Sequence, residues 1–202
     1  WQSQERETVD ALARDLDGTA LYLRYNSGRH ISTNGKEFAE LLERLVQQWP
    51  VAVKSLSVVA HSMGGLVARS ACHYAAAASL RWPALLRHFV FIATPHHGAP
   101  LERGGNWIDI ALGVSPYTAP LSRLGKIRSA GITDLRHTWL LDEDWRGRDR
   151  FARSSGHHAA VPLPDGAQCL AIAATAAKQV GDIQAGPVAD RLVPPASAPG
   201  VH

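Results

Sequence analysis

The 202-residue sequence predicts an α/β fold: a mostly parallel, doubly wound sheet with helices on both faces. Segments of helical period alternate with short runs rich in β-branched residues, which is the order of a parallel sheet. Those runs are almost wholly apolar, as in strands buried on two faces. With 46% apolar and 19% charged residues, the chain has a globular composition, and its length suits one domain spanning 1–202.

The first part of the chain predicts helix, strand and helix. Residues 3–16 place apolar side chains on one face, and A-L-Y-L-R-Y at 20–25 is typical of a strand. Asn34 followed by Glu37 is a capping-box pattern, so we expect the next helix to begin at Asn34 and end at Trp49, before a proline.

Three further strands are expected to build the rest of the sheet. An apolar run ends at Ala60, followed by a helix reaching about Leu80, and buried strands are predicted over 87–94 and 168–175. Between them, residues 98–166 mix tryptophans with Gly, Pro and charges. We expect this insertion to form a helical cap over the site, the alternative being a solvated excursion with its own small core.

The stretch S-L-S-V-V-A-H-S-M-G-G at 55–65 predicts a nucleophile elbow with Ser62 at the turn. In an elbow, a strand turns sharply into a helix and exposes the turn hydroxyl. Ala60 and Gly64 supply the small residues that the turn needs, and the Met63 amide would face the hydroxyl as an oxyanion donor. The alternative is an ordinary turn in which Ser62 caps the helix.

A nucleophilic serine needs a base and a carboxylate that orients the base. Asp190, in D-R-L-V-P beyond the last predicted strand, is the expected acid, although it could simply be a turn residue. Asp109 and Asp182 are weaker candidates that could equally be surface carboxylates.

The histidines fit the role of base poorly. His202 is the terminal residue, and His61 must diverge from its neighbour on a tight turn. His96 and His97 precede the acid, whereas hydrolases with such an elbow have the chain order Ser, acid, His. We therefore expect the base to lie outside this chain, together with the second oxyanion donor.

Charge and cysteine usage argue against other classes. A net charge of +3 without a dense basic run does not favour nucleic-acid binding. Cys72 and Cys169 stand in apolar patterns typical of buried free thiols. The histidine pairs at 96–97 and 157–158 have no cysteine or carboxylate at metal-ligand spacing. We therefore expect neither a metal nor a cofactor. No membrane-spanning run or signal peptide is present, and localisation is left open with the cytoplasm as default.

Three motifs in order together resemble α/β-hydrolases of the lipase/esterase type, in particular a bacterial group similar to the GPI inositol-deacylase domain. They are A-H-S-M-G-G at 60–65, T-P-H-H-G-A at 94–99 and D-R-L-V-P at 190–194, and the likeness extends to 25–28, 104–107 and 124–127. Two positions depart from the family pattern: Ala60 and Arg191 replace the usual glycines.

The resemblance implies a Ser-His-Asp esterase with Ser62 as nucleophile and Asp190 as acid. In such relatives the catalytic histidine lies well beyond the D-x-L-V-P stretch, and one oxyanion donor lies in a loop before the first helix. We therefore expect a fragment lacking both ends of its domain, inactive on its own.

The sequence thus predicts a serine hydrolase of small hydrophobic carboxylic esters, with no prediction of oligomeric state. A thioesterase or acyltransferase would use the same elbow, and a non-catalytic binding module on the same fold is the alternative from another class.

Overall fold

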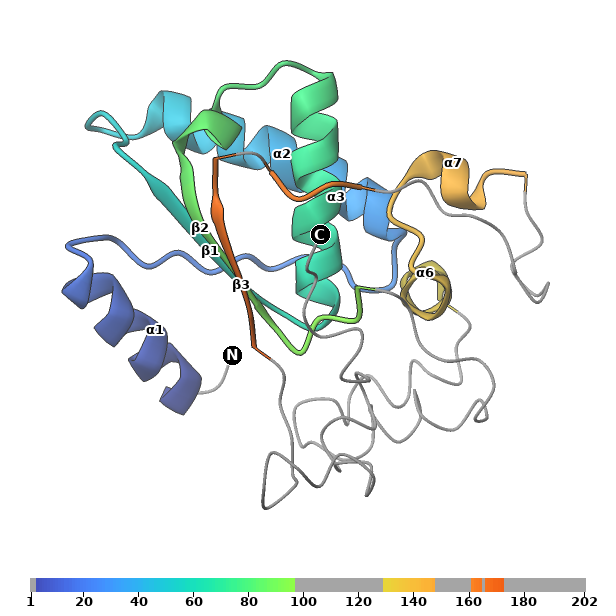
Figure 1. Cartoon of the computed structure of the whole chain (residues 1–202), viewed down its shortest axis with the longest axis horizontal. Helices are drawn as coiled ribbons and strands as arrows, with labels where there is room; N and C mark the ends of the chain where they lie inside the picture. Colours follow the sequence, from blue (N-terminus) through green and yellow to red (C-terminus); the bar gives the residue numbers. More distant parts are fainter. Residues whose placement is uncertain (1–2, 97–128, 148–160, 165, 173–202) are drawn as a thin grey trace.

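The computed structural model describes residues 3–96, 129–147, 161–164 and 166–172 (Figure 1). Within these ranges the strands form one parallel sheet in the order β1-β2-β3. The strands are β1 (Leu56–His61), β2 (Leu86–Ile92) and β3 (Gln168–Ile172). The helical elements are α1 (Ser3–Asp15), α2 (Ile31–Gln48), α3 (Met63–Ala77), the 3-10 helix η1 (Trp82–Leu85), α6 (Ala130–His137) and α7 (Asp142–Trp145). The predicted α/β class with a parallel sheet is confirmed.

One face of the sheet is buried beneath α3. The register places Phe89 of β2 opposite Val58 of β1 and Cys169 of β3, so these side chains share a face. Phe89 and Phe91 are buried there in a cluster with the small residues of α3. The other face is more open, since Leu170 and Ile172 on β3 are 55% and 44% exposed.

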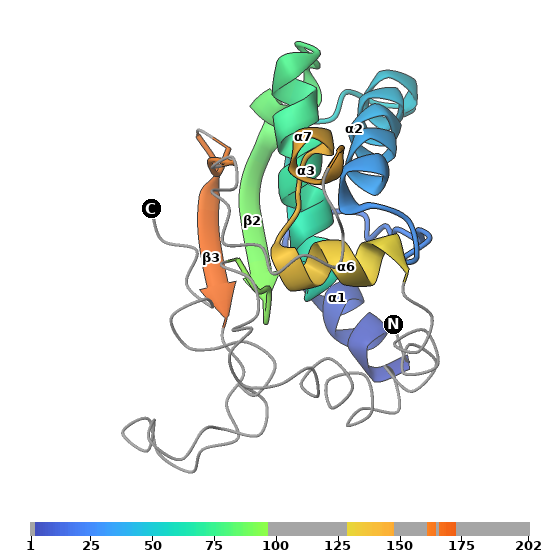
Figure 2. The same ribbon diagram turned by 90° about the vertical axis from the view of Figure 1, so that its right-hand side faces the viewer.

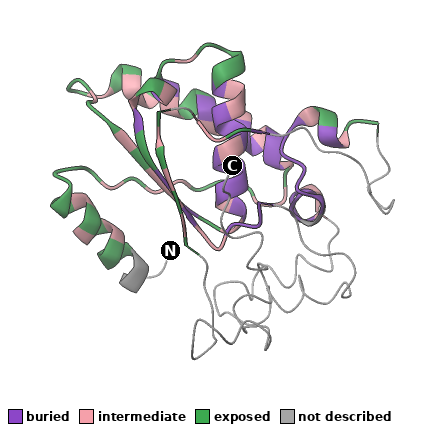
Figure 3. Cartoon of the chain, in the orientation of Figure 1, coloured by how far each residue is buried: buried purple, intermediate pink, exposed green. Residues whose placement is uncertain are grey.

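Helix α2 crosses α3 and packs against it, and α3 also contacts β1 (Figures 1 and 2). The two helices pack closely where Gly35 meets Ser70, because a Cβ at Gly35 would lie 2.6 Å from the Ser70 Cβ. The buried Ser70 hydroxyl donates to the Leu140 carbonyl at 2.7 Å. Buried residues accordingly gather along α3 and α6, whereas α1 is largely exposed (Figure 3).

The expected strand over 20–25 is wrong. This segment has no regular secondary structure, and its backbone forms no ladder with a described strand. An apolar alternation becomes a strand only when a neighbouring backbone pairs with it.

The predicted start of the second helix is also wrong. Helix α2 begins at Ile31, so Asn34 lies inside the helix, and its side-chain amide donates to the Asn26 carbonyl at 3.0 Å. At its other end the helix stops at Gln48, close to the expected Trp49.

Helix α3 ends at Ala77, three residues before the expected Leu80. Ser79 adopts a positive φ of 53°, the Ser79 amide donates to Ala76 and the Leu80 amide donates to Ala75. These two bonds form a Schellman motif, which satisfies the last carbonyls and reverses the chain. Leu80 then packs against the core cluster beneath α3.

Part of the expected insertion at 98–166 is described. Helices α6 and α7 belong to it. Ile132 and Leu135 of α6, and Leu141 just before α7, share a buried cluster with Met63 and Leu66 of α3. This portion therefore belongs to the packed core. That 98–166 caps the site stays a prediction.

Candidate functional site

The chain turns sharply at Ser62, between the end of β1 and the start of α3. Ser62 has φ 51° and ψ −126°, a region that costs a non-glycine residue about 1–3 kcal/mol. Two backbone bonds hold it there: the Ser62 amide donates to the Ile92 carbonyl of β2 at 2.9 Å, and the Gly65 amide donates to the Ser62 carbonyl at 3.0 Å. The predicted strand-turn-helix is confirmed, and its strain falls on Ser62.

The Ser62 hydroxyl is not a helix cap. Ser62 occupies the N-cap position of α3, yet its side chain accepts no hydrogen bond from the first turn. The interpretation of Ser62 as an ordinary cap is therefore wrong.

The Met63 amide is available at the same turn. As the first residue of α3, Met63 has an amide without an intrahelical acceptor. Its side chain is buried in the cluster that includes Ile31 and Ile132. Met63 therefore anchors the turn with its side chain and leaves its amide unpaired by the helix.

The adjacent glycines Gly64 and Gly65 in the first turn of α3 differ in how closely other residues approach them. A Cβ at Gly65 would lie 2.9 Å from Thr94 Cβ and closer still to the other two Thr94 side-chain atoms. The segment that follows β2 therefore touches α3 at Gly65. A Cβ at Gly64 would have one neighbour within 4 Å among the described residues, the Tyr25 hydroxyl at 3.8 Å. The close approach thus falls at Gly65, one residue after the predicted Gly64.

Thr94 is buried as well as tightly packed. It is 1% exposed, and its hydroxyl has no hydrogen-bond partner among the described residues. Its contribution is to fit against Gly65 and fix α3 relative to the end of β2.

Two of the histidines considered as bases, His61 and His96, lie among the described residues, and that neither is the base stays a prediction. His61 is exposed at the end of β1. His96 is buried, and its Nδ1 accepts a hydrogen bond at 2.9 Å from Nη1 of Arg69. Because a guanidinium can only donate, Nδ1 is unprotonated and engaged, and the ring is the neutral Nε2–H tautomer. Burial lowers the pKa of Arg69, whose other terminal nitrogen donates to the Val161 carbonyl.

Several predicted residues lie outside the described ranges. They are the expected acid Asp190, the weaker candidates Asp109 and Asp182, and the histidines His97 and His202. Their roles stay predictions.

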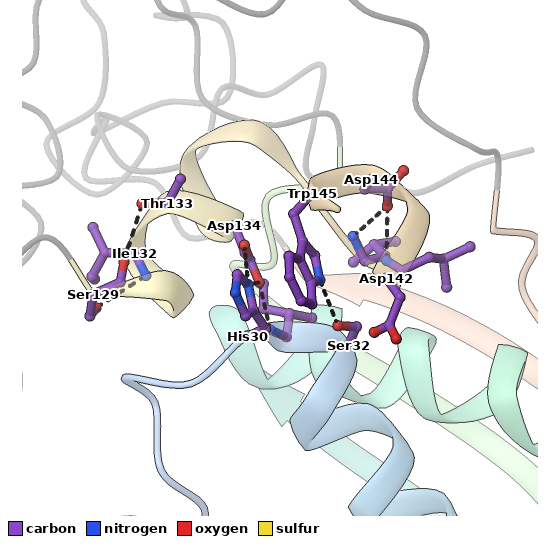
Figure 4. Close-up of polar contacts among 12 residues, drawn as sticks. His30, Ser32, Ser129, Ile132, Thr133, Asp134, Asp142, Asp144 and Trp145 are labelled. Atoms are coloured by element: carbon purple, nitrogen blue, oxygen red, sulfur yellow. Dashed lines mark hydrogen bonds and ion pairs between the residues drawn. The ribbon is translucent and has the colours of Figure 1, made fainter. Parts of the chain in front are cut away.

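A histidine–carboxylate pair that sequence analysis did not single out lies at the start of α2 (Figure 4). His30 Nδ1 is 3.0 and 3.1 Å from the two Asp134 carboxylate oxygens, and the Ile31 amide donates to Asp134 at 2.7 Å. The His30 ring stacks on Trp145, with centroids 3.8 Å apart and planes 4° from parallel. Trp145 Nε1 in turn donates to Ser32 at 3.0 Å.

The role of Asp134 is structural in this arrangement. Its side chain is fully buried, and burial raises its pKa to about 6 against the opposing effects of the Ile31 amide and His30. Its carboxylate supplies the helix cap that His30, the N-cap residue of α2, does not provide.

The two cysteines are free thiols, buried at Cys72 and half-buried at Cys169. Burial raises the pKa of Cys72 to about 12, which keeps the thiol protonated and unreactive. In the part of the chain that the structure describes, no group of three or more His, Cys, Asp or Glu residues could hold a metal ion. No described helix is long and apolar enough to span a membrane.

The strained turn joins a strand of a parallel sheet to the helix that follows it, within an α/β domain. The chain belongs to the family of the PGAP1-like alpha/beta domain, whose model matches residues 12–163. This match confirms the family resemblance, and it includes the motifs at 60–65 and 94–99 but not the one at 190–194.

Solved structures similar to this chain include Bacillus licheniformis lipase BlEst2 in its mature and propeptide forms. The TM-score is 0.45 for both, with 18% and 20% identity. In each case 65% of this chain is covered, but only 47% of the mature and 26% of the propeptide chain. The chain thus spans less than half the length of either lipase. No significant match exists among curated protein sequences.

Proposed function

We propose that this chain carries the nucleophile of a serine carboxylic-ester hydrolase, with Ser62 as that nucleophile. The observation that carries the proposal is the strained backbone of Ser62 (φ 51°), together with a side chain that does not cap the helix following it. Strain of this kind persists where the surrounding structure holds it, and it gathers at functional sites. A nucleophile elbow accounts for both features.

The proposed chemistry is acyl transfer to the Ser62 oxygen. Ser62 Oγ bonds to the ester carbonyl carbon while a histidine takes its proton, and the alcohol leaves with that proton as the carbonyl re-forms. Water then hydrolyses the acyl-enzyme by the same route. The Met63 amide would donate to the oxyanion. Asp190 would orient the histidine, which we expect downstream of residue 202.

The proposed substrate is hydrophobic because the 98–166 insertion, which we expect to cap the site, is rich in tryptophan, leucine and isoleucine. A small ester with an apolar acyl group would suit such a cap.

Fluorophosphonate labelling of the full-length protein that contains this chain tests the proposal. The Ser62→Ala variant should lose labelling and at least about 1000-fold of p-nitrophenyl ester turnover. Ser57→Ala is the matched control, because Ser57 is an exposed β1 serine whose hydroxyl lies 3.1 Å from His88 Nδ1, and it should behave as wild type. Labelling that survives in Ser62→Ala, or wild-type protein that never labels, would contradict the proposal.

Substrate comparison separates the remaining alternatives. A thioesterase or acyltransferase would label at Ser62 but turn over acyl-CoA faster than p-nitrophenyl esters. A binding module on this fold would bind a hydrophobic ester without Ser62-dependent turnover.

A further inference from the structure

The Tyr25 hydroxyl lies close to the first turn of α3, the helix that follows the proposed nucleophile Ser62. Its hydroxyl is the neighbour found 3.8 Å from a Cβ built on Gly64, two residues after Ser62. A turn fixes the chain just beyond it, where the Gly28 amide donates to the Asn26 side chain at 2.9 Å and the Arg29 amide to the Asn26 carbonyl at 3.1 Å. Tyr25 therefore reaches the first turn of α3 from a well-anchored segment.

The Tyr25 hydroxyl forms no hydrogen bond with any residue that the structure describes. The other tyrosines of this part of the chain differ: Tyr22 donates to Asp10 at 2.9 Å, and the Tyr74 oxygen accepts from the Asp142 amide at 2.9 Å. A desolvated tyrosine hydroxyl ordinarily finds a partner. An unused one beside a strained serine is therefore informative.

The phenol remains a hydrogen-bond donor over the whole working range of pH. Although 37% of the Tyr25 surface is exposed, burial of its hydroxyl end raises its pKa to about 12. The first turn of α3 presents partial positive charge from its amides, which favours the lone pairs of the phenol oxygen. The phenol hydrogen therefore remains available for donation to an oxygen other than a helix carbonyl.

We propose that Tyr25 contacts the substrate, donating a hydrogen bond to an oxygen of the ester held over the first turn of α3. The inference rests on the proposed role of Ser62 and adds a donor from a different part of the chain. Among the described residues, this hydroxyl is the one neighbour within 4 Å of a Cβ built on Gly64. The space there receives substrate, and the phenol fixes one of its oxygens.

Removal of the hydroxyl alone tests the inference. In the full-length protein, Tyr25→Phe should lower kcat/KM for p-nitrophenyl esters and the rate of fluorophosphonate labelling by about 10- to 100-fold. Its Tm should equal that of wild type, because no described residue loses a hydrogen bond. The matched control is Tyr22→Phe, three residues earlier, which should keep full activity although it loses the bond to Asp10.

The outcomes separate the two proposals. If Ser62→Ala is inactive while Tyr25→Phe matches wild type, the Tyr25 inference is wrong and the role of Ser62 stands. If Tyr25→Phe loses activity together with Tm, its hydroxyl has a structural role and the inference is again wrong. If the wild-type protein neither labels nor turns over esters, the proposed function is wrong and the Tyr25 inference fails with it.

Discussion

Helices α2 and α3 pack against each other, yet among the described residues only the first turn of α2 has an amide capped by a side chain. Neither N-cap residue, His30 or Ser62, caps its own helix. At α2 a buried carboxylate from α6, Asp134, takes over and accepts from the Ile31 amide. At α3 no described side chain accepts from the amides of Met63 or Gly64.

This difference separates a turn whose amides are satisfied within the protein from the turn where we propose that substrate binds. A side chain that caps the first turn accepts hydrogen bonds from its amides, which stabilises the helix and leaves those amides unable to bind a ligand. An uncapped turn beside a strained serine leaves donors for a developing negative charge. Within α3 a similar division recurs, since Thr94 fills the Gly65 side, whereas only the Tyr25 hydroxyl among the described residues comes within 4 Å of a Cβ built on Gly64.

The largest effect is expected when the filled side of α3 is overpacked. Gly65→Ala places a methyl group against all three side-chain atoms of Thr94, including Cβ, which cannot swing away. We expect a loss of about 3 kcal/mol or more in the free energy of unfolding, at the upper end of overpacking costs. Urea unfolding followed by circular dichroism measures this. The double variant Gly65→Ala/Thr94→Ser should recover part of the loss, and a Gly65→Ala protein as stable as wild type would contradict the packing.

Loss of the cap on α2 should have the next largest effect. Asp134→Ala leaves the buried Ile31 amide without its acceptor and His30 without its partner. We expect about 2–3 kcal/mol of destabilisation, less than for a fully buried ion pair because 27% of the His30 side chain is exposed. Asp10→Ala, which removes an exposed carboxylate bonded to Tyr22, is the control and should change stability by less than about 0.5 kcal/mol. An equal effect of the two variants would mean that the Asp134 cap contributes little.

The raised pKa of Asp134 makes its contribution depend on pH. With a folded pKa of about 6 against an ordinary 3.8, the folded chain binds more protons than the unfolded chain between these values. Stability from this group therefore falls as pH rises from about 4 to 6, by an amount on the order of 2 kcal/mol, and is constant above that. Denaturation of wild type and Asp134→Asn across this range isolates the slope, since Asn cannot titrate. A difference between the two proteins that stays flat with pH would contradict the pKa.

Local sequence patterns could predict the strained serine but not the partners that complete each turn. The apolar run into A-H-S-M-G-G identified Ser62, because strand, turn and helix are all encoded within a few residues. The true start of α2 was missed because Asp134, its cap, lies 103 residues further along the chain than Ile31. The small-residue rule placed the close contact at Gly64, whereas the position of Thr94 in the fold puts it at Gly65.

Local sequence patterns also could not predict the position of Tyr25 beside the first turn of α3. Residues 20–25 looked like a strand, and that pattern concealed the use of Tyr25 as a side chain over α3. A single tyrosine in an apolar run carries no signal of an unused hydroxyl. That information exists only once the turn at Asn26 and the first turn of α3 are placed together.

The smallest change in stability, with a distinct change in activity, is expected at Gly64. In the part of the chain that the structure describes, a methyl group there meets the Tyr25 hydroxyl alone, at an ordinary 3.8 Å, and alanine favours the helix over glycine. The free energy of unfolding of Gly64→Ala should thus equal that of wild type or exceed it by up to about 1 kcal/mol. Because the methyl occupies the space assigned to substrate, kcat/KM for esters should fall about 10-fold. A Gly64→Ala protein as unstable as Gly65→Ala would show that both sides of the turn are filled, and an undiminished kcat/KM would show that substrate does not enter between Tyr25 and α3.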